Sequence, residues 1–324
     1  TTLQAMLNAG IVPTVHAYGS LGCSGDLAPL SHVALAAIGE GWVRSSTGVE
    51  SAADALASAG ITPLVLQEKE GLALINGTDG MLGMLILALS DLRSLLRISD
   101  LVTAMSVEAL LGTDKVYSEQ LHALRPHPGQ AQSAANIRRL LTDSPIVASH
   151  RADTEHLVQD AYSLRCSPAV AGAARDTMDH ARAVAERELA STIDNPVILP
   201  GDRVESNGNF HGAPIAYALD FLAIAAADVA SISERRTDRM LDRSRSQGLP
   251  PFLAHETGVD SGYMIAQYAA AGIVSNLKRL ATPASVDSIP SSAMQEDHVS
   301  MGWAAGVKLR EAVDGLRRVL AIEL

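Results

Sequence analysis

Three residues in the glycine-rich stretch 19–30, GSLGCSGDLAPL, could build an electrophile from the backbone itself: Cys23, Ser24 and Gly25. Because glycine has no Cβ, the amide nitrogen of Gly25 can approach the carbonyl carbon of Cys23 closely. Attack by that nitrogen would close a five-membered ring around Ser24. Loss of water from the ring and from the Ser24 side chain would leave an exocyclic methylidene, which is a strong electrophile. The stretch is therefore a candidate catalytic loop.

The same stretch also fits a purely structural role. It would then be a flexible turn before a helix that begins near Asp26, with Ser24 or Asp26 as the N-cap and Pro29 in the first turn. This interpretation explains Asp26 and Pro29. It does not explain why glycine lies on both sides of the Cys23–Ser24 pair.

The stretch GSLGCSGDLAPLSHVAL closely resembles the signature loop of the histidine and aromatic amino acid ammonia-lyases. In that family an Ala-Ser-Gly triplet cyclises into 4-methylidene-imidazol-5-one (MIO). The resemblance implies that MIO forms autocatalytically from Cys23, Ser24 and Gly25, supported by Asp26. Cys23 stands where alanine is most common, but only its carbonyl and Cα would enter the ring. Closure is therefore still expected, with the thiol as a bystander.

Further segments resemble the same family in the same order, over essentially the whole chain. In EGLALINGTDGML, Asn76 matches the asparagine that hydrogen-bonds the ring of the electrophile; taken alone, it would be a turn or helix cap. In ASTIDNPVIL, Asn195 is expected to support the loop, although its place after a helix would also suit a turn. In SNGNFHGAPIA, Phe210 is expected near the electrophile, because a phenylalanine in a glycine loop is unlike core filling.

The segment VQDAYSLRCSP resembles the family's Gln-Asp-Pro-Tyr-Ser-Leu-Arg-Cys, with Ala161 in place of the proline. It retains Gln159, Tyr162 and Arg165, and a buried Tyr–Arg pair would suit a site for an amino acid. Arginine offers a bidentate fork to a carboxylate, and Tyr162 would move a proton or steady the electrophile. A structural ion pair is the alternative role for Arg165.

The segment SIPSSAMQEDHVSMG indicates the substrate. Histidine ammonia-lyases carry Gln-Glu-Asp-His-Val-Ser-Met here, whereas the phenylalanine enzymes carry an Asn-Gln-Asp variant, and this chain has Glu296 followed by Asp297 and His298. A glutamate can accept a hydrogen bond from an imidazole N–H. The resemblance thus implies L-histidine as substrate and urocanate as product. Ser292 or Asp297 would otherwise be an N-cap, and His298 a structural histidine.

Two other hypotheses remain open. The chain could be a phenylalanine or tyrosine ammonia-lyase or an aminomutase, which use the same electrophile. It could also be a helical scaffold whose loop never cyclises and which has no activity.

No metal is expected, since His150 and His156 lack zinc spacing. No nucleotide is expected either, because the sequence has no phosphate-binding glycine loop after a strand. The tyrosine and histidine that complete the family's site lie upstream of the loop, so we expect the N-terminal part of the fold, and the C-terminal end, to be missing.

Alanine, leucine and a helical period dominate the chain, which predicts a mainly α fold. The long helices expected, each roughly 35–50 Å at 1.5 Å per residue, cover about 78–111, 168–192, 214–243 and 297–324. Hairpins are expected at 41–51 and 196–206. The resemblance implies the long-helix central bundle of the ammonia-lyase/fumarase-like type, with 1–324 as a single core. It also implies a homotetramer in which three subunits share each active site.

Composition indicates which partners and which cellular compartment to expect. The 324 residues carry a formal net charge of −11, which argues against binding to nucleic acid or an anionic membrane. The basic run 233–246 is interleaved with acids and is expected to be a solvated or inter-subunit helix face. Two cysteines indicate a reducing cytoplasm. The apolar stretch 81–96 is broken by Asp91 and Arg93, so we expect a core helix and no membrane span.

Overall fold

The computed structural model describes residues 2–152 and 158–324. The chain falls into two compact units. The first comprises Thr1–Met84, Ala185–Tyr217 and Ala284–Gly306, and the second Leu85–Val184, Ala218–Pro283 and Val307–Leu324. Helices dominate, as the apolar periodicity predicts, so the mainly α fold is confirmed.

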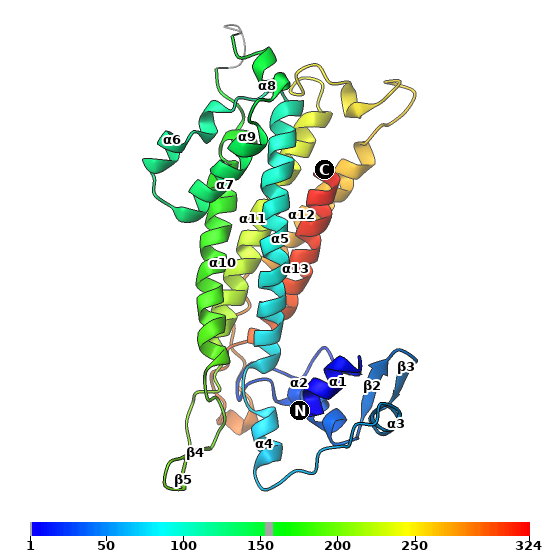
Figure 1. Ribbon diagram of the computed structural model, residues 1–324, viewed down its shortest axis with the longest axis vertical. Helices are drawn as coiled ribbons and strands as arrows, with labels where there is room; N and C mark the ends of the chain where they lie inside the picture. Colours follow the sequence, from blue (N-terminus) through cyan, green and yellow to red (C-terminus); the bar gives the residue numbers. More distant parts are fainter. Residues whose placement is uncertain (1, 153–157) are drawn as a thin grey trace. The chain divides into compact units, whose positions relative to one another are not determined.

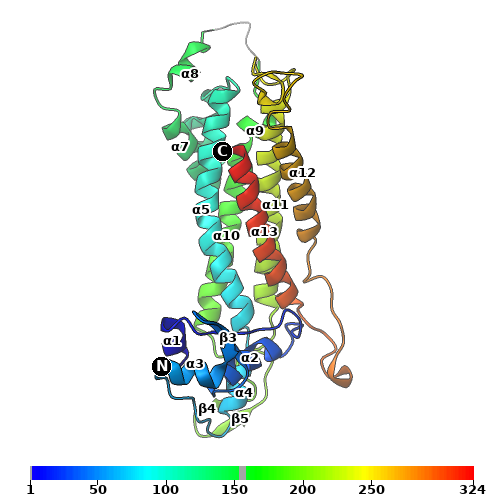
Figure 2. The ribbon, with the colours of Figure 1, turned by 90° about the vertical axis from the view of Figure 1, so that its right-hand side faces the viewer.

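Long helices form the second unit, and they run side by side in both views (Figures 1 and 2). They are α5 (Asp79–Ala109), α10 (Ser167–Leu189), α11 (Ala213–Leu241), α12 (Met264–Leu280) and α13 (Gly302–Glu323), of which all but α12 begin or end in the first unit. Leucine, valine and alanine at helical spacing fill the space between them, as in Leu309, Ala312, Val313 and Leu316 of α13.

Short helices surround one end of the second unit's core. They are η1 (Lys115–Tyr117), α6 (Glu119–Ala123), α7 (Pro128–Leu140), α8 (Pro145–Ser149), α9 (Tyr162–Arg165) and η2 (Pro251–Leu253). Buried Tyr117 packs there with Val107, Ile137 and Leu164. The proline at the start of α7 and of α8 lies where a helix needs no N–H partner.

The first unit combines short helices with two small antiparallel sheets. Its helices are α1 (Thr2–Asn8), α2 (Leu27–Ala37), α3 (Ala52–Ser58), α4 (Glu70–Ile75) and η3 (Ser292–Met294). One sheet has the order β1 (Val12–Pro13), β2 (Trp42–Ser45), β3 (Gly48–Ser51), with Val43 opposite Glu50. The other pairs β4 (Val197–Leu199) with β5 (Arg203–Glu205). Both predicted hairpins are thus confirmed.

Three of the four predicted long helices match to within three residues at each end, but two predictions need correction. Helix α13 begins at Gly302, not near Asp297, so neither Ser292 nor Asp297 caps it. The reason is tertiary: the Met301 N–H donates to the Leu21 carbonyl at 2.8 Å and the Ser300 hydroxyl to the Gly22 carbonyl at 2.7 Å, and Met301 has the non-helical φ of 55°. Helix α12 was not predicted, although its buried Ala270, Val274 and Leu277 have helical spacing.

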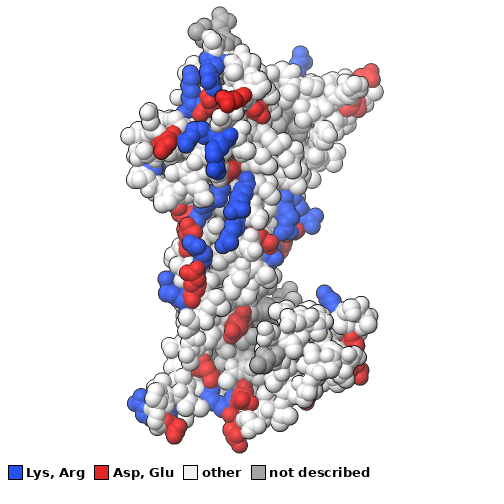
Figure 3. Space-filling model, viewed as in Figure 1, with Lys and Arg blue, Asp and Glu red and all other residues white. Residues whose placement is uncertain are grey.

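The basic run 233–246 is not simply a solvated face. Arg236 and Ser233 are fully buried, and Glu234 nearly so. Arg236 forms an ion pair with Glu323 of α13, which removes the desolvation problem of a buried guanidinium. On the face shown in Figure 3, acidic and basic side chains both occur over the helices of the second unit.

One described helix, α11, is long and apolar enough to cross a membrane on length and composition alone. Of its apolar window, 61% is buried inside the structure, which is the behaviour of a core helix. The stretch 81–96 does not meet the same criterion.

Candidate active site

The Cys23–Gly25 triplet adopts a tight turn that brings the predicted reacting atoms together. The Gly25 amide nitrogen contacts the carbonyl oxygen of Cys23 across Ser24. Gly25 has φ +79°, and a Cβ there would overlap the carbonyl oxygen of Gly77. Glycine is therefore required at this position, both for the backbone conformation and for the approach of Gly77. The turn fits the closure of a ring around Ser24.

Glu296 lies against this turn although 272 residues separate it from Ser24. The Ser24 hydroxyl donates to Oε1 of Glu296 at 3.0 Å. The Ser291 hydroxyl donates to Oε2 at 2.7 Å, and backbone hydrogen bonds also join Ser291 to Glu296 around η3. The Ser291 hydroxyl is the main cause of a pKa for Glu296 below its usual value, so the carboxylate is held ionised.

The Cys23 thiol also faces this carboxylate. Burial, followed by the hydrogen bond to Glu296, raises the pKa of the thiol above its usual value. The thiol therefore stays protonated at neutral pH. It was expected to take no part in ring closure, and in the folded chain it has Glu296 as a partner.

Asp26 is fully buried directly after the triplet. It precedes α2, but its side chain does not cap that helix. Instead Oδ2 accepts the Met81 N–H at the start of α5 at 2.7 Å, and Oδ1 accepts the Ser20 hydroxyl at 2.9 Å. Burial is the main reason why the pKa of Asp26 is raised to about 6. The prediction that Asp26 caps α2 is therefore wrong, and its side chain caps α5 instead.

Asn76 and Asn195 form one connected group beside the loop. The side-chain amide of Asn76 donates to the Asn195 carbonyl at 2.9 Å, and the Asn195 side chain accepts the Asn207 N–H at 2.9 Å. Gly77, the next residue after Asn76, pairs with Gly25 as an isolated bridge. The Asn76 side chain therefore ties Asn195 to this group, and the backbone of Gly77 ties the group to the loop.

Phe210 lies half-buried just before α11, in a segment that contacts the loop. The Gly212 N–H donates to the Gly22 carbonyl at 3.3 Å. The ring of His211 stacks on that of His298, with centroids 5.9 Å apart. Sequence reasoning gave no role to His211, and the signal that could have found it is its place beside Phe210. The His298 side chain is exposed, and its role as a structural histidine stays a prediction.

Gln159, Tyr162 and Arg165 belong to the second unit, whereas the other eight predicted site residues belong to the first. The Arg165 guanidinium lies 4.6 Å from the centroid of the Tyr162 ring, and its Nε donates to the Asp160 carbonyl at 3.0 Å. The expected burial of the Tyr–Arg pair is wrong for Tyr162, which is 70% exposed, whereas Arg165 is half-buried. Gln159 is exposed. Within the described residues no ion pair joins Arg165 to a carboxylate, and its alternative role as a structural ion pair stays open.

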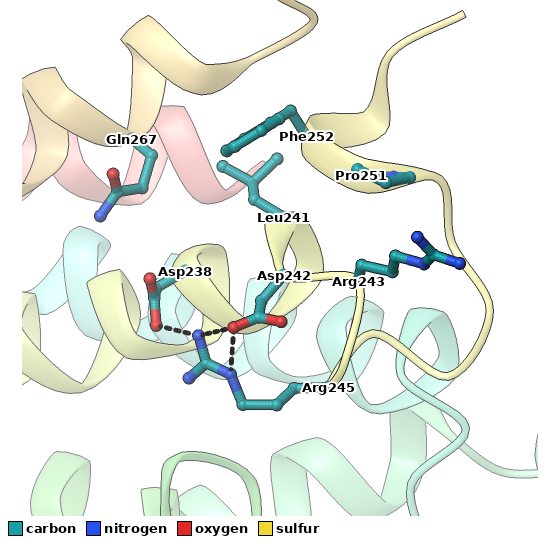
Figure 4. Close-up of a pocket in the computed structure, with 8 residues that line it drawn as sticks. All are labelled: Asp238, Leu241, Asp242, Arg243, Arg245, Pro251, Phe252 and Gln267. Atoms are coloured by element: carbon teal, nitrogen blue, oxygen red, sulfur yellow. Dashed lines mark hydrogen bonds and ion pairs between the residues drawn. The ribbon is translucent and has the colours of Figure 1, made fainter. Parts of the chain in front are cut away.

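The pocket in Figure 4, of about 290 Å³, lies at the end of α11 and contains none of the predicted site residues. Arg245 reaches Asp238 at 2.9 Å and Asp242 at 2.6 Å, so its charge is already neutralised. His156 lies outside the described residues. Among those described, no group of three or more His, Cys, Asp or Glu side chains could hold a metal ion.

Comparison with known proteins extends these observations. The family described as Aromatic amino acid lyase matches residues 1–324. Histidine ammonia-lyases of Streptomyces avermitilis and Streptomyces griseus are 67% and 65% identical to the chain over all 324 residues. The chain spans 63% of the length of these relatives.

Longer solved structures superpose closely on this chain. Histidine ammonia-lyase from Trypanosoma cruzi has a TM-score of 0.88 at 40% identity, covering 98% of this chain and 60% of that one. Tyrosine aminomutase from Streptomyces globisporus has a TM-score of 0.93 at 39% identity, covering 99% and 64%. The predicted central-bundle fold is therefore confirmed.

Proposed function

Because the chain belongs to the aromatic amino acid lyase family, we propose that it forms the core of an enzyme that eliminates ammonia from L-histidine and yields urocanate. The observation that carries this proposal is the position of Glu296, whose carboxylate lies 3.0 Å from the Ser24 hydroxyl. A held carboxylate beside the candidate electrophile suits an imidazole N–H better than a phenyl ring. Relatives that are 65–67% identical and named histidine ammonia-lyase support the same substrate.

The residues present fit the formation of MIO. The turn at Cys23–Gly25 places the Gly25 nitrogen against the Cys23 carbonyl, and the Gly77 backbone, next to Asn76 in the chain, pairs with Gly25 and accepts the Asp26 N–H. Once formed, MIO supplies an electrophile that takes the substrate amine and turns it into a better leaving group. We propose that Asn76 hydrogen-bonds the ring and that Asp26 and Asn195 support the loop.

The remaining residues bind and orient the substrate in this proposal. Glu296 accepts the imidazole N–H, because its carboxylate stays ionised. Arg165 binds the substrate carboxylate through its two-pronged guanidinium. Tyr162 exchanges a proton or steadies the electrophile, Gln159 contributes a polar contact, and Phe210 packs against the bound ligand. No metal or nucleotide takes part.

We further propose a cytoplasmic homotetramer with active sites shared between subunits. The exposed face of α5 supports the assembly, since it presents Leu87, Ile98, Leu101 and Met105 at helical spacing. The exposure of Tyr162, with Arg165 stacked on it, suits residues that complete a site on another subunit.

The full-length protein, incubated with L-histidine, L-phenylalanine or L-tyrosine, tests the proposal. We expect ultraviolet absorbance to report urocanate from L-histidine and little cinnamate or coumarate. The peptide that contains Cys23–Gly25 should be lighter by two waters, and Ser24→Ala should abolish both the mass loss and the activity. Cinnamate or a β-amino acid as main product would instead support a phenylalanine or tyrosine enzyme or an aminomutase, and an unmodified peptide without activity would indicate an inactive scaffold.

A further inference from the structure

Two buried side chains hold the short helix α9, which carries Tyr162 and Arg165. The Tyr117 hydroxyl donates to the Leu164 carbonyl at 2.9 Å. Arg236 Nη1 donates to the Ser163 carbonyl at 3.1 Å. Both donors are fully buried. A four-residue helix has few hydrogen bonds of its own. A backbone N–H reaches the Leu164 carbonyl at the C-terminal end of α9, and the two side-chain bonds add contacts that tie α9 to the buried core.

Arg236 is itself fixed in place. Its guanidinium pairs with both oxygens of Glu323, with Nη2 2.8 Å from Oε2, and neither side chain is exposed. The hydroxyls of Ser106 and Ser233 donate to the same carboxylate at 2.7 and 2.5 Å. Every charged atom in this group has a hydrogen-bond partner. Arg236 is therefore held in one conformation, in which its Nη1 donates to the Ser163 carbonyl.

The proposed chemistry makes no direct use of these buried groups, and the basic run that contains Arg236 was not expected to be buried. We propose that Tyr117 and Arg236 are positioning residues, which fix α9 so that the Tyr162 ring and the Arg165 guanidinium keep their stacked arrangement for the substrate. This inference rests on the proposed function, in which Arg165 binds the substrate carboxylate. Neither Tyr117 nor Arg236 touches the substrate in it.

Loss of the Tyr117 donor should loosen α9. Without the Tyr117 hydroxyl, the buried Leu164 carbonyl keeps only the backbone N–H that it accepts at the C-terminal end of α9. Loss of its second donor favours conformations in which α9 moves or unwinds. The guanidinium of Arg165 is attached one residue later and moves with it. Misplacing a binding group by about 1 Å is enough to cost about a hundredfold in rate. The main effect should fall on KM for the amino acid, because Arg165 is proposed to bind and not to react.

Tyr117→Phe in the full-length enzyme tests the inference, since it removes one oxygen and keeps the ring that packs in the core. We expect faster amide hydrogen exchange in a peptide that covers 160–166, and a KM for L-histidine about tenfold higher with a smaller change in kcat. Ser133→Ala is the matched control. It removes a buried 2.5 Å hydrogen bond from Ser133 to Asp100 in the same unit, without a hydrogen bond to α9.

The control should lower the melting temperature to a similar extent and leave both exchange at 160–166 and KM unchanged. Unchanged exchange at 160–166 in Tyr117→Phe would overturn the inference, as would an equal effect of Ser133→Ala on KM. Exchange is measured without substrate, so it decides the positioning role even if the wild-type enzyme releases no urocanate. That last result would refute only the proposed function.

Discussion

At the scale of single residues, Ser291 controls the charge of the group that is proposed to choose the substrate. Its hydroxyl is the main cause of the lowered pKa of Glu296. Replacing Ser291 with alanine removes that donor, so the pKa of Glu296 should rise and a smaller fraction should be ionised in weakly acidic solution. We expect the acidic limb of the kcat/KM profile for L-histidine to move to higher pH.

The control for this profile is Ser288→Ala, in the same segment. The Ser288 hydroxyl accepts the Val299 N–H at 2.9 Å, and among the described residues it makes no hydrogen bond to Glu296. Its acidic limb should match that of the wild-type enzyme. If the limb stays in place in Ser291→Ala as well, Glu296 is not the group that must be ionised.

Gly25 sets the geometry of the candidate electrophile. With φ +79° and the Gly77 carbonyl where a Cβ would lie, Gly25→Ala should strain the turn, at about 1–2 kcal/mol for the conformation alone and more for the overlap. We expect the peptide at 23–25 to keep both waters and the lyase activity to be lost. Mass spectrometry measures the first and urocanate release the second.

Gly208→Ala is the matched control, because open space surrounds Gly208 and its φ is ordinary. It should mature and react as the wild-type enzyme does. A light peptide in Gly25→Ala would show that the turn seen here is not needed for ring closure.

At the scale of elements, Asp26 ties the loop to the first turn of α5. Burial raises its pKa from 3.8 to about 6, so the folded state binds this proton more tightly than the unfolded state. The resulting stabilisation is complete below about pH 3.8 and is lost as the pH rises through about 6. A shift of this size corresponds to about 3 kcal/mol.

Asp26→Asn removes this titration and keeps an oxygen that can accept the Met81 N–H. We expect its free energy of unfolding to fall less than that of the wild-type protein between pH 4 and pH 7, by up to about 3 kcal/mol. Denaturant titrations across this range measure the difference. Parallel curves for the two proteins would mean that the Asp26 carboxyl titrates alike in the folded and unfolded states.

The same elements show what the sequence can and cannot predict. Apolar spacing located α5, α10 and α11, because their burial is decided along one helix. It could not show that Asp26 caps α5 and not the adjacent α2, because that choice depends on which N–H groups lie nearby in space. The same holds for Arg236, whose burial depends on Glu323 from another helix.

The contacts of the predicted site were likewise only partly predictable from the sequence. Only the resemblance, and no rule of spacing, connected Ser24 with Glu296 across 272 residues. The role of Ser291 was not predicted, since a serine before a glutamate has no distinctive pattern. The exposure of Tyr162 also differed from expectation, because sequence chemistry does not tell whether a site is completed within one chain or by another.

At the scale of the whole molecule, the uncharged face of α5 is the strongest indication of assembly. Leu87, Ile98, Leu101 and Met105 are 37–59% exposed, and exposed Ser90 and Ser94 between them carry no charge. Exposed apolar side chains aligned on one helix face in this way indicate an interface. In the proposed tetramer these residues would be buried by neighbouring subunits.

Leu101→Glu should therefore break the proposed tetramer, while Leu101→Met at the same position should preserve it. Burying an unpaired carboxylate is strongly unfavourable, whereas methionine keeps the apolar contact. Sedimentation velocity of the full-length protein should show smaller species for the glutamate variant alone. Because each active site is proposed to need residues from several subunits, urocanate release should fall in proportion to the tetramer lost. A glutamate variant that stays tetrameric would exclude the stripe as an interface, and one that dissociates with full activity would show that each subunit holds a complete site.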